Sequence, residues 1–447
     1  MQHFVLDRDQ ELTTSDIAQI IGVFETSNLP EYQKLFNYYL GKQAILQKHY
    51  ADPTKPISKI VTNFCHEIVQ QYSGYICGQP VKYNNDNVGD IVNILNYNDV
   101  ATEDSELLKQ ALIYGIGFEI NYIDLDGKQR FAALDTRQCI PIYSADLTSD
   151  LLYVIRFWRE SSAKKLTEGE YYIEVYGPDM VRKYSSTSGF TSFTLISEEP
   201  HYFGQCPVSV FKLNEDCEGI YKQIIGLQDA YNELLSSQLD DYTSFVDCYM
   251  VLKGAIATEE DLAQMKENRV LVLDPDSSAE YLTKDINNTP VKEMLENYKE
   301  QIYNKTCCPD FTKDTFNAQT GIAIRYKLIQ LDNAVANIEA QFKKALQRRI
   351  ELICSVLYMT GNEEAWRDIE IVFTRNLPDT LMPANISELV QLKGLVSDET
   401  LLGLLSWIKD SKAELEKVKE QQESNFNLYN MGLNNGDRLL ETSRTED

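Results

Sequence analysis

The sequence lacks the features that would place it among secreted, membrane or zinc-binding proteins. Its nine cysteines are odd in number and scattered, and no C-x-x-C pair occurs. This usage indicates a reduced intracellular protein rather than a disulfide framework or a zinc module. The N-terminal stretch MQHFVLDRDQELTT is acidic and has no apolar segment, so we expect no signal peptide. No run of eighteen apolar residues occurs either, so we expect no membrane span.

Positive charge is also scarce. The 42 Lys and Arg residues stand against 68 Asp and Glu residues, which gives a formal net charge of −26. Binding nucleic acid by neutralising its phosphates needs many basic side chains, so this composition excludes tight binding driven by charge alone. A protein that surrounds DNA without adhering to it stays open, although solubility is the simpler explanation of the charge.

Motifs for catalysis are missing as well. The chain has no G-x-x-x-x-G-K-[ST] phosphate loop, no G-x-G-x-x-G fingerprint and no G-x-S-x-G elbow. Its four histidines lack metal-ligand spacing. We therefore predict that the protein is not an enzyme and uses no cofactor or metal ion. One alternative is a metal-dependent nuclease that uses Asp124 and Asp126, although D-x-D-G at a hairpin corner usually serves the turn.

What the sequence does contain is enough apolar material for cores and for long helices. Its 447 residues are 43% hydrophobic and 11% aromatic, which predicts two to four domains or one elongated subunit of several parts. The most informative segment is a polar loop at 311–319 followed by a helix over 320–359, with Gly361 as a stop signal. At ~1.5 Å per residue this helix would be roughly 60 Å long, so it must pack against other helices.

The other patterns predict an α+β fold that is mainly helical. Ser15 is expected to cap a helix through Val23, and Pro30 to begin another that ends near Gly41. A β-rich block follows over 118–212, and we expect the strand IEIVFTRNLP to find its partners there. The remaining expected elements are a helix at 219–246, an α/β insertion with strands at 249–252, 269–273 and 280–282, a returning helix at 289–303, and C-terminal helices at 386–395, 399–409 and 412–423.

The helix at 219–246 carries an acidic face. Asp229, Glu233 and Asp240 lie at i, i+4 and i+11, within about 40° of one another, and no Lys or Arg occurs between them in the helix. One interpretation is an exposed, solvated surface. The other is an anionic wall that faces something to which it must not adhere.

Several phrases of the sequence, in this order, resemble the phage portal proteins of the SPP1-type, or Gp6-like, family. They are YYLGKQAI, KIVTNFCHEIVQQYSGYICGQPV, LIYGIGFEINYIDLDGKQRFAALDTRQCIPIY with YVIRFW, IIGLQDAYNELLSSQLDDYTSFVDCYMVLKG, PDFTKDTFNAQTGIAIRYKL, IVFTRNLP and GLVSDETLL. The resemblance covers about residues 37–419 and rests on the order of the phrases, since each alone is weak. Two departures are Thr320, where the family has a serine, and a short C-terminal tail.

The resemblance implies an elongated subunit whose parts surround a central channel when copies form a ring. These parts are a wing at 1–214, a first stem helix at 215–246, a clip at 247–288, a second stem helix at 289–310, a tunnel loop at 311–319, a long tunnel helix at 320–361, a returning wing strand at 362–385, crown helices at 386–424 and a flexible tail at 425–447.

The function implied by the resemblance is that of a non-catalytic conduit in a tailed bacteriophage. Such rings, usually of twelve copies, occupy one vertex of the capsid, and double-stranded DNA enters and leaves through them. The implied partners are further copies of the chain, DNA without sequence specificity, the terminase large subunit at the clip, major capsid and scaffolding proteins, and a head-completion or adaptor protein, with no membrane. The ring belongs to the virion and is assembled in the host cytoplasm. Another ring-shaped connector or adaptor without motor contact is the alternative, but it would not need the clip insertion.

Under this interpretation certain residues should face DNA. In the tunnel loop they are Phe311, Thr312, Lys313, Asp314, Thr315, Phe316, Asn317 and Gln319. We expect Lys313 to contact phosphate and Asp314 to limit that contact, while the two phenylalanines anchor the loop by burying their rings. Asp229, Glu233 and Asp240 become candidates for the channel wall, where repulsion of phosphate would permit sliding.

Overall fold

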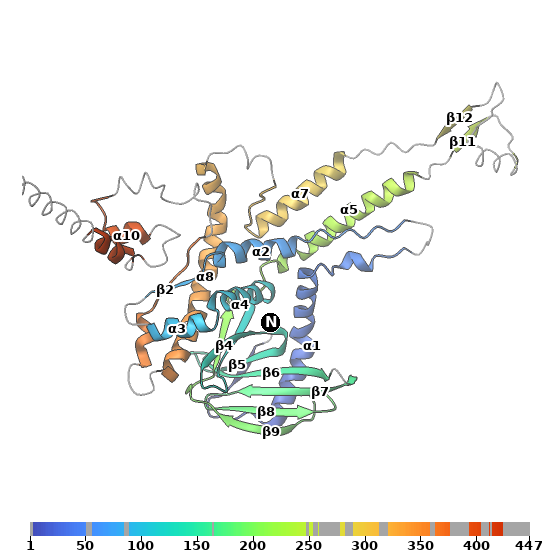
Figure 1. The fold of residues 1–447 in the computed structure, drawn as a ribbon. Helices are drawn as coiled ribbons and strands as arrows, with labels where there is room; N and C mark the ends of the chain where they lie inside the picture. The colour runs from blue at the N-terminus through green and yellow to red at the C-terminus, as the bar shows by residue number, and fades with distance from the viewer. Residues whose placement is uncertain are drawn as a thin grey trace, which may run out of the picture. The chain divides into compact units, whose positions relative to one another are not determined.

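The computed structural model divides the chain into two compact units, whose elements are drawn in Figure 1. The described residues are 3–50, 56–84, 89–162, 165–246, 250–253, 258, 278–281, 289–312, 321–357, 363–375, 393–403, 411 and 414–422. The first unit comprises Met1–Gln71, Leu107–Ile120 and Ala133–Asp310, and the second comprises Tyr72–Glu106, Asn121–Ala132 and Phe311–Asp447. Both helices and strands are present, as the sequence predicts.

The first unit is built on a six-stranded sheet in the order β1-β5-β6-β7-β8-β9. Its strands are β1 (Phe4–Leu6), β5 (Cys139–Ser144), β6 (Leu151–Ser162), β7 (Lys165–Tyr176), β8 (Met180–Ser186) and β9 (Thr194–Pro200). β1 runs parallel to β5, and the other neighbours are antiparallel. A second sheet joins β10 (Val208–Lys212) to β3 (Ile116–Ile123), which is followed by β4 (Gln129–Leu134). The predicted β-rich block is confirmed.

Helix α1 (Thr14–Tyr39) packs on the large sheet through Phe24, whose ring meets Phe157 of β6 edge-on at 5.7 Å. Thr13, not Ser15, caps the helix, in a reciprocal capping box with Asp16. The expectation of two helices is wrong, because Pro30 lies inside one continuous helix. Phe24 and Tyr32, on either side of the proline, contact each other at 5.9 Å and bury the same face, and this packing offsets the backbone hydrogen bond that proline cannot make.

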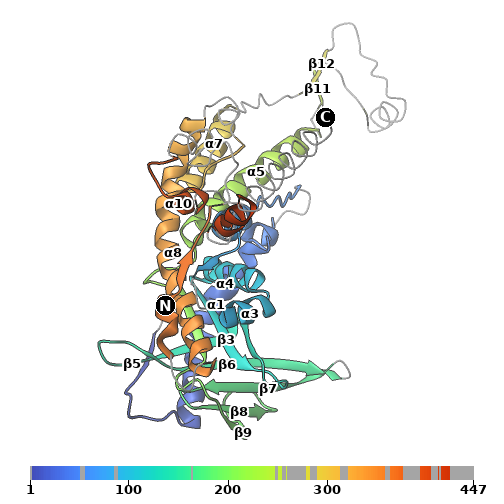
Figure 2. The ribbon, with the colours of Figure 1, turned by 60° about the vertical axis from the view of Figure 1, so that its left-hand side comes forward.

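The first unit also contains the two predicted stem helices, α5 (Ile225–Val246) and α7 (Thr289–Lys305), which lie side by side in Figures 1 and 2. A 3-10 turn (Lys222–Ile224) precedes α5, so the α-helix begins later than the predicted residue 219. Strands β11 (Met250–Lys253) and β12 (Ser278–Tyr281) pair antiparallel between the two helices in sequence. They confirm two strands of the expected insertion, whose third strand lies outside the described residues.

The second unit contains α3 (Gly89–Tyr97), the first part of α4 (Val100–Tyr114) as far as Glu106, and the long helix α8 (Gly321–Leu357). The 37 residues of α8 confirm the predicted rod within its described part. Its buried face repeats at three- and four-residue intervals through Leu331, Val335, Ile338, Phe342 and Leu346.

The strand after α8 pairs differently from our expectation. β13 (Glu370–Val372) lies antiparallel to β2 (Lys82–Asn84), not to a strand of the β-rich block. Tyr83 of β2 hydrogen-bonds both Asp104 of α4, at 3.1 Å, and Arg349 of α8, at 3.3 Å, so these contacts hold β2 beside the C-terminal part of α8, where β13 can pair with it.

The described C-terminal residues agree with part of the prediction. α10 (Asp398–Gly403) is capped by Ser397, whose hydroxyl accepts from the Thr400 N–H at 3.3 Å, and residues 414–422 are helical. Lys393 bridges to Val396 around Gly394, where φ is +91°, so this end of the predicted helix at 386–395 is a turn instead. The rest of that segment lies outside the described residues.

Candidate functional site

The polar face of α5 is hydrogen-bonded to residues 58–64, which run beside it and which we call the strap; its last residue, Phe64, opens helix α2 (Phe64–Cys77). Alternate backbone N–H groups of the strap donate to side-chain oxygens spaced four residues apart on α5. The four bonds are Ser58 N to Asp240 Oδ1 at 2.6 Å, Ile60 N to Ser236 Oγ at 3.0 Å, Thr62 N to Asn232 Oδ1 at 2.9 Å and Phe64 N to Gln228 Oε1 at 3.1 Å. We call this arrangement the polar ladder.

The rungs of the ladder stay in register because the repeat of acceptors along α5 and the repeat of N–H groups along the strap have nearly the same length. Four residues of α-helix rise ~6.0 Å, and two residues of extended chain advance roughly 6.6 Å. A buried N–H needs an acceptor, and the strap finds its acceptors on α5 instead of on a neighbouring strand. Gln228, Asn232 and Ser236 are fully buried as a result. The sequence signal for this site was an i+4 series of side-chain acceptors, which our sequence analysis did not use.

Lys48 is the second feature that the sequence analysis missed. Its ammonium lies 3.1 Å from Glu233 Oε1 and 3.2 Å from both Asp240 Oδ2 and Ser237 Oγ, and its side chain is only 7% exposed. Burial alone would lower the pKa of Lys48. Hydrogen bonds with Tyr50, Glu233 and Asp240 raise the pKa by more than burial lowers it, so the ammonium stays protonated.

The acidic face of α5 is therefore compensated by a cation from another segment. Glu233, with a side chain 56% exposed, shares Lys48 with Asp240, whose side chain is 10% exposed. Asp229 is half-buried and accepts from the Tyr38 hydroxyl at 2.8 Å. Within the single chain, Glu233 and Asp240 thus have a cationic partner from outside the helix, and Asp229 has a neutral donor.

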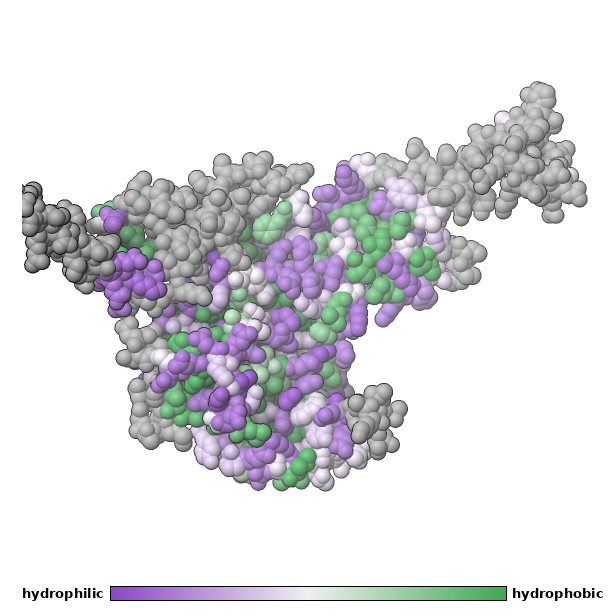
Figure 3. Space-filling view, in the orientation of Figure 1, coloured by the Kyte–Doolittle hydropathy of each residue, from purple (hydrophilic) through white to green (hydrophobic). Residues whose placement is uncertain are grey.

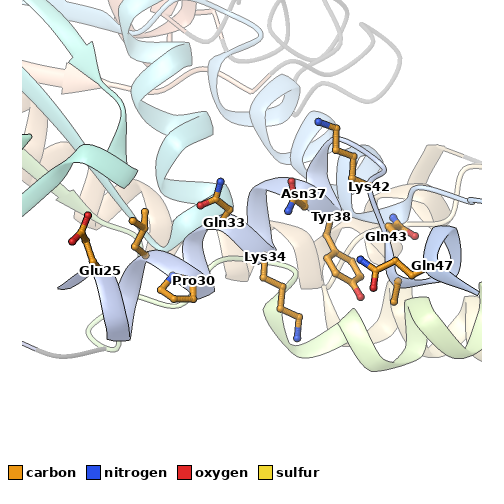
Figure 4. A pocket seen from close by; sticks show the side chains of 11 residues that line it. Glu25, Pro30, Gln33, Lys34, Asn37, Tyr38, Lys42, Gln43 and Gln47 are labelled. Atoms are coloured by element: carbon orange, nitrogen blue, oxygen red, sulfur yellow. The ribbon is translucent and has the colours of Figure 1, made fainter. Parts of the chain in front are cut away.

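Tyr38 also lines an open groove of about 600 Å³ along α1, drawn in Figure 4. Figure 4 shows Tyr38 near the end of α1, on the side that faces α5. Gln43, just after the helix, has an Oε1 that accepts from Asn232 Nδ2 of α5 at 2.5 Å. Burial, followed by the hydrogen bond to Asp229, raises the pKa of Tyr38, so its hydroxyl remains a donor at neutral pH. These contacts join α1, the strap and α5 into one polar unit.

Two of the predicted tunnel-loop residues are described. Phe311 is 51% exposed, and Thr312 follows it in a turn. The anchoring role of the two phenylalanines stays a prediction. Lys313, Asp314, Thr315, Phe316, Asn317 and Gln319 lie outside the described residues. The chain leading to the loop is fixed by an ion pair between Lys299 Nζ and Asp310 Oδ2 at 3.0 Å and by a hydrogen bond from Tyr303 to Glu67 at 2.7 Å.

The hairpin considered for a nuclease site uses its first aspartate to hold the turn. Asp124 Oδ1 accepts from the N–H groups of Asp126, at 3.0 Å, and Lys128, at 2.9 Å, while Gly127 takes a φ of +75°. This confirms the turn interpretation. Across the described ranges, no group of three or more His, Cys, Asp or Glu residues is arranged to hold a metal ion. Within the same ranges no helix is long and apolar enough to cross a membrane.

Comparison with known proteins extends over nearly the whole chain. Residues 24–426 match the family model described as phage portal protein, SPP1 Gp6-like. The portal protein of Bacillus phage SPP1 is 22% identical over 460 aligned residues, covering 94% of this chain and 89% of that one. The portal protein of Clostridium phage phiCD119 is 22% identical over 454, covering 95% and 99%.

Two of the solved structures to which the chain is similar come from gene transfer agent particles. The neck of an empty particle is 12% identical with a TM-score of 0.46, and the virion of a native particle is 11% identical with a TM-score of 0.43. Each alignment covers 76% of this chain and 89% of the other.

Proposed function

The chain belongs to the SPP1 Gp6-like family of phage portal proteins, and from this premise we propose that copies of it assemble into a ring, expected to be a dodecamer, around a channel for double-stranded DNA. The ring would form the portal vertex of the virion, after assembly in the host cytoplasm. It would conduct DNA without catalysing a reaction.

The observation that carries ring assembly is an apolar surface left open on the stem helices. Leu239 and Tyr242 of α5 are 43% and 41% exposed, and Met294 of α7 is 47% exposed. Figure 3 shows hydrophobic residues gathered over α5. Exposed apolar patches on otherwise polar surfaces mark sites of association, and a neighbouring stem would cover this one.

The charge of the chain supports a channel that does not retain DNA. Each copy adds a formal charge of −26, and duplex DNA carries about one negative charge per 1.7 Å of its axis. Glu233 and Asp229 remain our proposed wall residues. Asp240 is 7% exposed and serves the polar ladder, so it has little surface to present to phosphate.

We assign the remaining proposed contacts to separate parts of the chain. Residues 247–288, the clip, would contact the terminase large subunit and later a head-completion protein, and the wing would contact the major capsid and scaffolding proteins. The loop at 311–319 would form the narrowest collar of the channel. The length of α8 supports this assignment, because a helix of 37 residues can hold the loop at a defined distance from Asp104, which pairs with Arg349 near the other end of the helix.

Negative-stain electron microscopy of the purified full chain tests the proposal. Rings with a central hole are expected for the wild-type protein. Met294→Asp and Tyr242→Asp should leave single subunits, because a buried charge opposes packing of the stems. Leu125→Asp, at a fully exposed position on the β3–β4 hairpin, is the matched control and should still form rings. Single wild-type subunits at micromolar concentration would contradict the proposal.

A further inference from the structure

The connection between β5 and β6, residues 145–150, is a rigid loop with a leucine at its tip. Arg8, which follows β1, donates to Asp146 Oδ2 at 2.5 Å, to Thr148 Oγ1 at 2.7 Å and to Asp150. Inside the loop Asp146 accepts from the Ser144 hydroxyl, the Thr148 hydroxyl and the Ser149 N–H, at 2.7, 2.6 and 3.2 Å. We call this loop, together with Arg8, the knob.

Leu147 at the tip of the knob is fully exposed, at 102%. The hydrogen bonds beneath it already order the backbone, so inserting this side chain into a partner would cost little further conformational entropy. The two aspartates are 41% and 56% exposed beside their shared arginine, and the knob carries a net charge of −1. A second cation can therefore reach both carboxylates.

The groove along α1 has the complementary character. Leu29, Pro30 and Ala44 give it apolar walls, and Lys34 and Lys42 stand against one acid, Glu25. Neither lysine forms an ion pair with any residue that the structure describes. A surface with a net positive charge stands out in a chain whose total is −26.

We propose that the knob of one copy docks into the α1 groove of the next copy, with Leu147 against Leu29 and Pro30, and with Asp146 and Asp150 facing Lys34 and Lys42. The inference rests on the proposed ring and names one of its contacts. Two different surfaces of the same chain meet in it, which is the kind of interface that closes a ring when the rotation between copies is right.

Zero-length crosslinking tests the contact directly. Unlabelled and ¹⁵N-labelled chains are mixed before assembly and treated with a carbodiimide, which joins a lysine to a carboxylate that touches it. Mass spectrometry should find Lys34 or Lys42 joined to Asp146 or Asp150 in peptides that combine both isotopes. Rings that form but give no such mixed crosslink would overturn this inference and leave the ring intact.

Substitution tests the apolar part of the contact. Leu147→Asp should raise the dissociation constant of each subunit contact by about tenfold, which corresponds to ~1.4 kcal/mol per contact, and so lower the ring fraction at a fixed subunit concentration. Leu125→Asp, at another fully exposed leucine, should leave the fraction unchanged. Equal ring fractions for the two variants would contradict the docking of Leu147, whereas a wild-type chain that forms no rings would instead refute the proposed function.

Discussion

Arg349 of α8 and Asp104 of α4 form an ion pair in which both side chains are removed from solvent, with Nη1 and Oδ1 2.5 Å apart and side-chain exposures of 0% and 2%. The guanidinium also lies 4.4 Å from the centre of the Phe131 ring. Within the second unit, this pair joins the C-terminal part of α8 to α4.

Arg349→Met should destabilise the second unit by ~3–5 kcal/mol, because it leaves the buried carboxylate of Asp104 without its ionic partner. Hydrogen exchange of α4 and α8 peptides measures the change as faster opening of both helices. The neighbouring Arg348→Met is the matched control. Arg348 pairs with Glu351 at side-chain exposures of 25% and 31%, so its loss should cost less than ~1 kcal/mol. Equal effects of the two variants would contradict the assigned role of the buried pair.

Ser236→Ala should release a single rung of the polar ladder. The Ile60 N–H would lose its acceptor, which costs ~1–3 kcal/mol for a buried group. Hydrogen exchange resolved to single amides should show faster exchange at Ile60, with little change at Phe64. Ser237→Ala, one residue along the same helix, touches no strap N–H and should leave Ile60 protected. Unchanged exchange at Ile60 in the Ser236 variant would mean that the ladder does not protect the strap.

The pH dependence of stability should report the Asp240 carboxyl. Burial alone would raise the pKa of Asp240, but hydrogen bonds from Ser58 and Lys48 hold it below its usual value. A carboxyl with a depressed pKa in the folded state contributes stability above the unfolded value, near pH ~3.9, and loses it as the pH falls further. Lys48→Met should therefore lower the melting temperature most near pH 7, and the difference from wild type should narrow below about pH 4. Lys305→Met, at an exposed lysine, should give a small difference that does not vary with pH.

Charge reversal on α5 tests the proposed channel wall. Asp229→Lys with Glu233→Lys should slow the passage of DNA during packaging, because added cations attract phosphate. The effect should weaken as salt rises, since the attraction is electrostatic. Asp126→Lys, at an exposed acid on the β3–β4 hairpin, is the control for reversing a charge outside the proposed wall. Packaging rates that match those of the control would remove Asp229 and Glu233 from the wall.

The β3–β4 hairpin offers a paired test of turn chemistry. Asp124→Ala should cost ~1 kcal/mol, because two N–H groups lose their acceptor, whereas Asp126→Ala should be nearly neutral. Thermal unfolding of the two variants side by side measures the difference. Cleavage of DNA by the wild-type chain with Mg²⁺, lost in the Asp126 variant, would instead support a nuclease.

Much of the fold follows from local patterns in the sequence. The helix at 320–359 was visible because nothing interrupts its period, and the hairpin at Asp126-Gly127 because Gly127 is needed at a positive φ. The break expected at Pro30 was wrong because local propensity does not include the contact between Phe24 and Tyr32. The partner of the strand at Glu370–Val372 was wrong because pairing depends on where α8 brings the chain.

The sequence by itself determined the family, the order of the parts, the acidity of the chain and the positions of its long helices, because these follow from composition, period and the order of motifs. Only the tertiary structure decided what the acids of α5 do. Lys48 and the strap lie more than 160 residues before α5 in the chain, so no local pattern connects them with Glu233 or Asp240. Folding brings a buried cation and a row of backbone donors to that face. A carboxylate that both of them hold stabilises the fold and has little surface left to present to a partner.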